Sequence, residues 1–168
     1  MTSPDILDRV LALRAEFDSA FAAPLRPARD QWTDLLTIRV GTTPYALRAD
    51  ELAGLHVDKT VTAVPGAPAA VRGLAGFRGS VVVVWDLAVL LGGAAEPGAR
   101  WIVVAAADPE AAFSFGGFDG HVRVDGAAIA PDDDTSPHPT VSVDGVVRTI
   151  VALPALLAEI SKSNGGLK

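Results

Sequence analysis

The stretch that most constrains the fold of this chain runs through Phe77-Arg78-Gly79 into the residues Ser80–Trp85, which read Ser-Val-Val-Val-Val-Trp. A β-branched run without polar alternation predicts a strand too apolar to have a wet face. It stops at Asp86-Leu87, and glycines occupy positions 73, 76 and 79 before it. We therefore expect turn glycines that lead into a core strand, with Arg78 at the joint. One helical turn is predicted just before them, at Pro68–Arg72.

The rest of the chain from Trp32 onward reads as short strands separated by turn signals. The clearest hairpin joins Val141–Val143 to Val146–Val151 through a turn at Asp144-Gly145. Phe115–Gly120 is too glycine-rich for a regular strand and predicts a bulge or a close backbone approach. Nine or ten short strands, with short helices at the joints, indicate a small β-barrel or a pair of barrels.

A helix is predicted at each end of the chain. Residues 3–23 carry large apolar side chains at helical spacing, namely Ile6, Val10, Leu13, Phe17 and Phe21. We divide the chain into an N-terminal amphipathic helix (1–24), a linker (25–31), a main domain (32–160) and a frayed tail (161–168), with the C-terminal helix beginning at Pro154. Two roles stay open for the first helix: packing on its own domain, or docking on another protein or a second copy.

Composition excludes several classes of partner and site. The net charge is −6 and no cluster of Lys and Arg is present, which argues against nucleic acid and anionic membranes. The chain has no cysteine, so disulfides and zinc-thiolate sites are impossible. No signal peptide is predicted, and no apolar run is long enough for direct membrane insertion. These features fit a cytoplasmic location.

No arrangement of residues points to catalysis. The histidines, at 56, 121 and 138, do not lie beside a serine and an acid in any known nucleophile motif. Asp132–Asp134 with His138 could be imagined as a metal site, but a solvated acidic loop is the preferred interpretation. We predict no catalytic residue, no cofactor and no metal. An enzyme with a metal site in the acidic loop is kept as a remote alternative.

The central stretch resembles the signature of CheW-like domains, the adaptors of bacterial chemotaxis arrays. That signature has a proline-bearing turn, a short apolar helix, glycine, Leu-Arg-Gly, a Val/Ile-rich strand and Asp-Leu. This chain supplies matching residues at Pro65, Pro68, Val71, Gly73, Phe77-Arg78-Gly79, Val81–Val84 and Asp86-Leu87. Weaker matches lie at Gly41–Leu47, Asp119-Gly120 and Val147–Leu157, so that the resemblance covers residues 32 to 160.

The resemblance implies a mainly β fold: two intertwined five-stranded SH3-like β-barrels that share a core, here with an N-terminal helix and short helices at the joints. It implies no catalysis. Its partners would be the regulatory domain of a CheA-type histidine kinase and the cytoplasmic tip of methyl-accepting chemoreceptors, clustered in receptor arrays. Carried over by position, the partner-binding residues are Arg78, Leu52, Leu55 and Gly73, and the residues of the structural motif are Gly79, Asp86 and Pro68.

Departures from the signature support a second hypothesis. Gly76 replaces the usual Asn, Phe77 replaces Leu, and Gly54 occupies a position that often bears a carboxylate. A diverged adaptor could have kept one partner only, or could self-associate through residues 3–23. Arg78 also has a structural alternative, in which it bonds turn carbonyls between Gly76 and Gly79.

Overall fold

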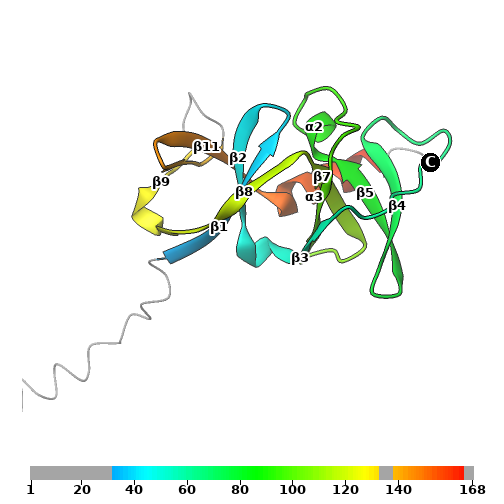
Figure 1. The fold of residues 1–168 in the computed structure, drawn as a ribbon, viewed down its shortest axis with the longest axis horizontal. Coiled ribbons are helices and arrows are strands. Elements are labelled where there is room, and N and C mark those ends of the chain that lie inside the picture. Colours follow the sequence, from blue (N-terminus) through cyan, green and yellow to red (C-terminus); the bar gives the residue numbers. More distant parts are fainter. Residues whose placement is uncertain (1–31, 133–137, 165–168) are drawn as a thin grey trace, which may run out of the picture. The chain divides into compact units, whose positions relative to one another are not determined.

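The computed structural model describes residues 32–132 and 138–164 (Figure 1). The chain divides into two units, Met1–Gln31 and Trp32–Lys168, and all described residues belong to the second. The predicted helix over residues 3–23 lies outside the described residues, so its role stays a prediction.

The described residues form two β-sheets, which confirms the mainly β fold. Sheet A has the order β8-β1-β2-β11-β10-β9, with β1 (Trp32–Val40), β2 (Thr43–Arg48), β8 (Gly117–Asp125), β9 (Ile129–Ala130), β10 (Thr140–Val143) and β11 (Val146–Val151). Sheet B has the order β3-β6-β7-β5-β4, with β3 (Leu52–Val57), β4 (Val71–Phe77), β5 (Ser80–Asp86), β6 (Trp101–Ala105) and β7 (Ala111–Phe115). The expected five strands hold for sheet B, whereas sheet A has six because the short β9 pairs with β10.

The two sheets are intertwined because sheet B is inserted into sheet A along the chain. Sheet B comes from one continuous segment, and sheet A comes from the two segments that flank it. The flanking segments meet where β2 and β11 pair in parallel, with Tyr45 opposite Thr149. Parallel neighbours need a crossover connection, which the inserted sheet provides here. In Figure 1, β8 leads the chain from β7 back into sheet A.

Each sheet has a small core of its own, and both contribute to a larger shared core. Strand β6 shows the reason, since its side chains alternate between the two faces of sheet B. Ile102 and Val104 belong to the cluster of sheet B, while Val103 and Ala105 belong to the shared cluster. Leu35, Ala46, Val141 and Ile150 form the separate cluster of sheet A.

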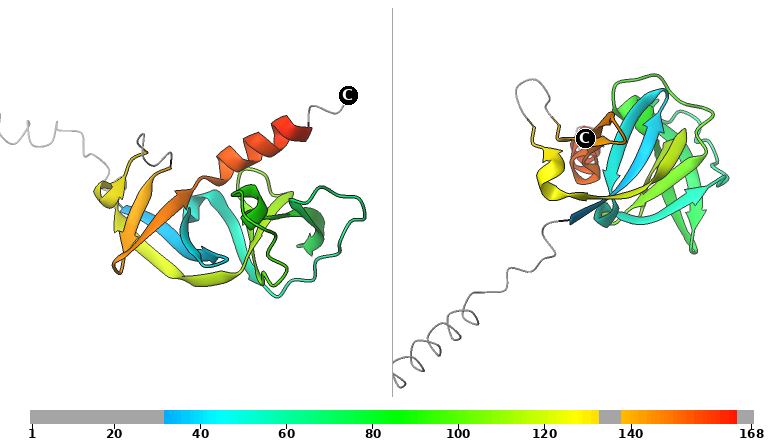
Figure 2. Two further views of the ribbon diagram at one scale, coloured as in Figure 1. Left: turned by 90° about the horizontal axis from the view of Figure 1, so that it is seen from above. Right: turned by 60° about the vertical axis from the view of Figure 1, so that its left-hand side comes forward.

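Two α-helices complete the shared core. Helix α2 (Leu87–Leu90) contributes the fully buried Leu87, and helix α3 (Leu153–Asn164) contributes Leu153 and Leu156. Figure 2 shows α3 leaving β11 of sheet A and extending toward sheet B. Within the described residues, no helix combines the length and apolar character needed to cross a membrane.

Several local predictions need correction. Gly73 and Gly76 lie inside strand β4, because backbone pairing with β5 outweighs the turn preference of glycine. Strand β4 begins at Val71, so Pro68–Arg72 forms a turn and the start of the strand instead of one helical turn. Val81 is 68% exposed, since it follows the hairpin turn at the uncovered end of β5. Helix α3 continues past Ser161 to Asn164, where a frayed tail is expected.

Candidate partner-binding surface

Arg78 lies at the tip of the hairpin between β4 and β5. Phe77 pairs with Ser80, so the turn consists of Arg78 and Gly79, with φ of +48° and +87°. Positive φ at both central residues characterises the type I′ turn, whose first position is usually Asn, Asp or Gly. Glycine adopts this conformation freely, whereas an arginine is strained in it. Turn chemistry therefore does not explain why position 78 is an arginine.

The Arg78 side chain has no internal partner that would explain it either. It is exposed, and it makes no hydrogen bond or ion pair with any described residue. The carbonyl of Gly76 instead accepts a hydrogen bond from Lys59 Nζ at 3.2 Å. The alternative in which Arg78 bonds the turn carbonyls does not occur in this structure.

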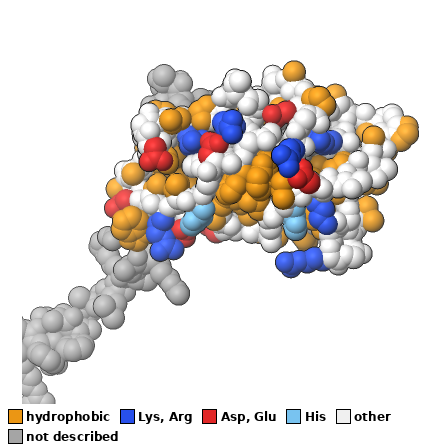
Figure 3. Space-filling model, viewed as in Figure 1, with side chains coloured by type: hydrophobic (Ala, Val, Ile, Leu, Met, Phe, Trp, Pro, Cys, Tyr) orange, Lys and Arg blue, Asp and Glu red, His pale blue; other side chains and the backbone are white. Residues whose placement is uncertain are grey.

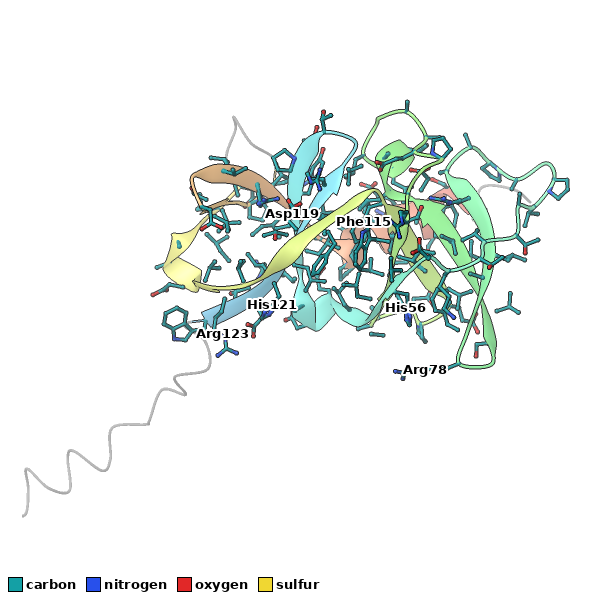
Figure 4. All side chains as sticks on the ribbon, in the orientation of Figure 1. His56, Arg78, Phe115, Asp119, His121 and Arg123 are labelled. Carbon is teal, nitrogen blue, oxygen red and sulfur yellow. The ribbon has the colours of Figure 1, made fainter. Side chains whose placement is uncertain are left out.

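A small cavity of about 180 Å³ joins this hairpin to strand β3. Its walls are formed by Ala53, His56, Phe77, Arg78, Ser80, Val104 and Pro109. The His56 ring centroid lies 4.7 Å from that of Phe77, and Lys59 Nζ lies 5.2 Å from the same phenyl centroid. Burial lowers the pKa of His56, and the charges of Lys59 and Arg78 lower it further. Figure 4 shows His56 and Arg78 close together, near β3 and the tip of the β4–β5 hairpin.

Leu52 and Leu55 lie on β3 and pack against the shared core, partly buried. Residues three apart on a regular strand face opposite sides. Here the register shifts between Leu52 and Gly54, which leaves Ala53 as an extra residue. This bulge turns both leucines toward the shared cluster, whereas His56 lines the cavity beside Arg78. The structure thus places Leu52 and Leu55 on the strand that faces Arg78, but not in contact with it.

Gly73 is buried in β4 and has a backbone reason to be glycine. Its φ is +151°, and a Cβ added there would lie 2.3 Å from the carbonyl oxygen of Thr62. Thr62 and Leu74 exchange two backbone hydrogen bonds of 2.8 Å across this point. The segment that contains Thr62 can therefore pack against β4 only if residue 73 is glycine. Contact of Gly73 with a partner stays a prediction.

Asp86 and Pro68 both lie at the open end of the β4–β5 hairpin, opposite the turn at Arg78. Asp86 is buried, and its Oδ1 accepts hydrogen bonds from the N–H groups of Ala88 at 3.0 Å and Val89 at 3.4 Å. Its Oδ2 accepts a bond of 2.9 Å from the N–H of Glu96, which anchors the loop after α2. The carbonyl of Pro68 accepts a bond from the N–H of Val71.

Two aromatic residues that were not predicted as site residues join the sheets at the surface. Trp101 of β6 and Phe118 of β8 have ring centroids 5.1 Å apart, with an angle of 50° between the rings. Both are partly buried against the shared core, as are Leu52 and Leu55. We call these four residues the central surface. Figure 3 shows hydrophobic side chains gathered in the middle of the face that it draws. No local motif signals Trp101 and Phe118, because only the pairing of the sheets brings them together.

Next to the central surface, a bulge in β8 presents Asp119 to two arginines. Thr37 pairs with Gly120 and Ile38 with Phe118, so Asp119 is an extra residue on β8, as the glycine-rich sequence predicts. Arg39 Nε donates to Asp119 Oδ1 at 2.8 Å, and Arg148 Nη2 lies 3.1 Å from Oδ2. Burial by itself would raise the pKa of Asp119, but the two arginines outweigh burial and lower it. We call Arg39, Asp119 and Arg148 the Asp119 cluster.

A second ion-pair group lies further along β1 and β8. Arg123 Nε and Nη2 donate to the two carboxylate oxygens of Asp34 at 3.0 and 3.1 Å, and His121 Nε2 lies 3.2 Å from Asp34 Oδ1. The hydrogen bond from Arg123 lowers the pKa of Asp34. In the part of the chain that the structure describes, no group of three His, Asp or Glu residues could hold a metal ion. The acidic-loop alternative depends on residues 133–137, which lie outside that part.

Comparisons with known proteins agree with this architecture. The family model described as "CheW-like domain" matches residues 34–161. Among solved structures, the chain is similar to the scaffolding protein TtCheW from Thermoanaerobacter tengcongensis, with a TM-score of 0.65 and 16% sequence identity. The alignment covers 74% of this chain and 91% of that protein. A search of curated proteins finds no match.

Proposed function

Because the chain belongs to the CheW-like domain family, whose members are non-catalytic scaffolds of chemotaxis signalling, we propose that it couples methyl-accepting chemoreceptors to a CheA-type histidine kinase. In this proposal the protein acts in the cytoplasm, within receptor arrays. It binds the cytoplasmic tip of the receptor and the regulatory domain of the kinase, and it carries out no reaction itself.

The observation that carries this proposal is the placement of Arg78. An exposed arginine holds a strained turn position and has no hydrogen bond or ion pair among the described residues. A side chain that costs stability and makes no internal hydrogen bond or ion pair is best explained by a contact with another molecule. Lys59 lies close by, so this end of the surface suits a partner that brings negative charge.

The central surface supplies the apolar part of such a contact. Interfaces of adaptors combine an apolar centre with a polar rim, and aromatic and arginine side chains dominate their binding energy. Leu52, Leu55, Trp101 and Phe118 fit the centre, and Arg78 fits the rim. We assign the partner contact to this face on that basis.

The test is binding of the Arg78→Ala variant to the receptor tip fragment and to the kinase regulatory domain. Loss of either complex, with an unchanged circular dichroism spectrum, is the expected result. Arg123→Ala is the matched control, since Arg123 is also an exposed arginine, on strand β8, but is already paired with Asp34. Normal binding of both partners by Arg78→Ala would contradict the proposed role.

A second candidate is a diverged adaptor that has kept one partner or self-associates through residues 3–23. The glycine at position 54, where relatives often carry a carboxylate, favours it. Deleting residues 1–24 discriminates between the two. A shortened chain that stays monodisperse and keeps both partners would restrict the helix to a local role.

A further inference from the structure

Asp119 orients the guanidinium of Arg39 at the surface through one hydrogen bond. Only Nε of Arg39 is used, in the 2.8 Å bond to Asp119 Oδ1, so both Nη groups have no hydrogen-bond partner among the described residues. The side chain of Arg39 is 54% exposed. Its guanidinium lies across Gly117, where an added Cβ would be 3.0 Å from Nη2. The planar group is therefore oriented by Asp119 and open to solvent on its outer edge.

Arg148 makes the cluster cationic. Asp119 would neutralise Arg39 if the two formed a simple pair, but Asp119 Oδ2 is also paired with Arg148. The Arg148 side chain is only 11% exposed, its Nη1 donates to the carbonyl of Ile38 at 3.3 Å, and its Nε is buried without a partner. One carboxylate between two guanidinium groups leaves a net positive charge, and Arg39 carries it to the surface.

Stability does not account for this arrangement. A buried charge is costly to desolvate, and a hydrophobic side chain of similar volume is often as good or better for stability. Arg148 lies on β11 near the buried Ile150, where an apolar residue would pack without leaving an unpartnered Nε. The burial of a second cation behind Asp119 is more simply explained if the charge of Arg39 is needed at the surface.

The cluster lies at the edge of the central surface. Asp119 directly follows Phe118 on β8, and Phe118 contacts Trp101. Figures 3 and 4 place Asp119 on one side of the hydrophobic area, with His56 and Arg78 on the opposite side. An overall net charge of −6 makes a local positive charge here more selective, because the rest of the protein repels acidic partners.

We propose that the Asp119 cluster is a carboxylate-recognition site at the edge of the central surface, and that Arg39 selects a partner segment which places a Glu or Asp beside its apolar stripe. The two open Nη groups form a planar donor pair, which matches the two oxygens of a carboxylate. This inference rests on the proposed function, since it takes the occupant of the central surface to be the receptor tip.

The test is a titration of the full chain with the cytoplasmic tip fragment of a methyl-accepting receptor, at low and at high salt. Arg39→Glu is expected to weaken binding by about tenfold, mainly through the association rate, and to reduce the salt dependence. Arg148→Leu leaves Arg39 in place but neutralises its charge through Asp119, so it should weaken binding as much as Arg39→Gln does. Substituting one Glu or Asp of the tip fragment by Lys should restore binding of Arg39→Glu.

Arg123→Glu is the control, because Arg123 is similarly exposed and also paired with one carboxylate. Circular dichroism and the urea midpoint verify that each variant is folded. If the wild-type chain binds and the Arg39 and Arg148 variants bind as tightly as Arg123→Glu, the inference is wrong and the proposed function stands. If the wild-type chain does not bind the tip fragment at all, the receptor part of the proposed function fails and this inference fails with it.

Discussion

Replacing Arg78 by asparagine is expected to stabilise the protein while removing a partner contact. The chain contains a second turn of the same kind, Asp144-Gly145, between Val143 and Val146. The first residues of the two turns have φ of +48° and +52°, and the second residues are both glycine. The two turns therefore differ mainly in having arginine or aspartate at the first position.

The magnitude follows from the cost of the left-handed conformation. That conformation costs an ordinary L-residue about 1 kcal/mol, and Asn and Asp are the non-glycine residues that visit it routinely. Arg78 makes no hydrogen bond that the substitution would remove, and its charge opposes protonation of the nearby His56. Arg78→Asn should thus raise the free energy of unfolding by about 1 kcal/mol and the melting temperature by about 3 °C.

Urea unfolding followed by tryptophan fluorescence measures this difference, and an unchanged m-value shows that the midpoints can be compared. The reciprocal variant, Asp144→Arg, should lower the free energy of unfolding by a similar amount. Binding of the receptor tip or kinase domain is measured on the same Arg78→Asn sample and should fall. An unchanged or lower stability of Arg78→Asn, together with a neutral Asp144→Arg, would refute the reasoning that Arg78 is strained.

Three further outcomes can be measured with the same unfolding assay. Gly73→Ala should cost at least about 2 kcal/mol, because its Cβ would overlap a backbone carbonyl at left-handed φ, whereas Gly76→Ala, with open space around it, should cost less than about 1 kcal/mol. Asp86→Ala should cost about 2 kcal/mol, because it leaves three backbone N–H groups without their acceptor; a loss below about 0.5 kcal/mol would contradict this role. Burial raises the pKa of Glu51 above 4.5 despite the hydrogen bond from the N–H of Leu153, so the folded state binds this proton more tightly than the unfolded state does. The stability that Glu51 contributes should therefore be lost as pH rises through its raised folded-state pKa, and Glu51→Gln, whose amide oxygen can still accept that bond, should lose less stability than the wild type over the same rise; parallel pH profiles would exclude the effect.

Local sequence signals predicted the elements that depend on neighbouring residues. The strand Ser80–Asp86 and the hairpin around Asp144-Gly145 follow from β-branched runs and turn chemistry, which act over a few residues. The same signals misjudged Gly73 and Gly76. Glycine spacing suggests a turn, but pairing with β5 and the approach of Thr62 place both residues in a strand. Such long-range pairing cannot be read from a window of neighbouring residues.

The residues of the candidate site divide in the same way, into those that local sequence signals reveal and those that only long-range pairing brings together. Arg78 could be found from the sequence because it belongs to a contiguous motif, together with Gly79 and Asp86-Leu87. Trp101 and Phe118 could not, since their contact requires β6 and β8 to meet at the boundary of two sheets. Arg39 and Arg148 are unremarkable in the sequence, and only the bulge at Asp119 brings them to one carboxylate.

The sequence by itself determined the fold class, the family motif and the residue at the tip of the central hairpin, because these depend on short-range patterns. The tertiary structure alone decided which side chains share a surface. Inserting sheet B into sheet A places residues more than a hundred positions apart in the chain, such as Ile38 and Arg148, in direct contact. Charge and apolar area act through such distances in space, so the character of the partner-binding face emerges only once the two sheets are intertwined.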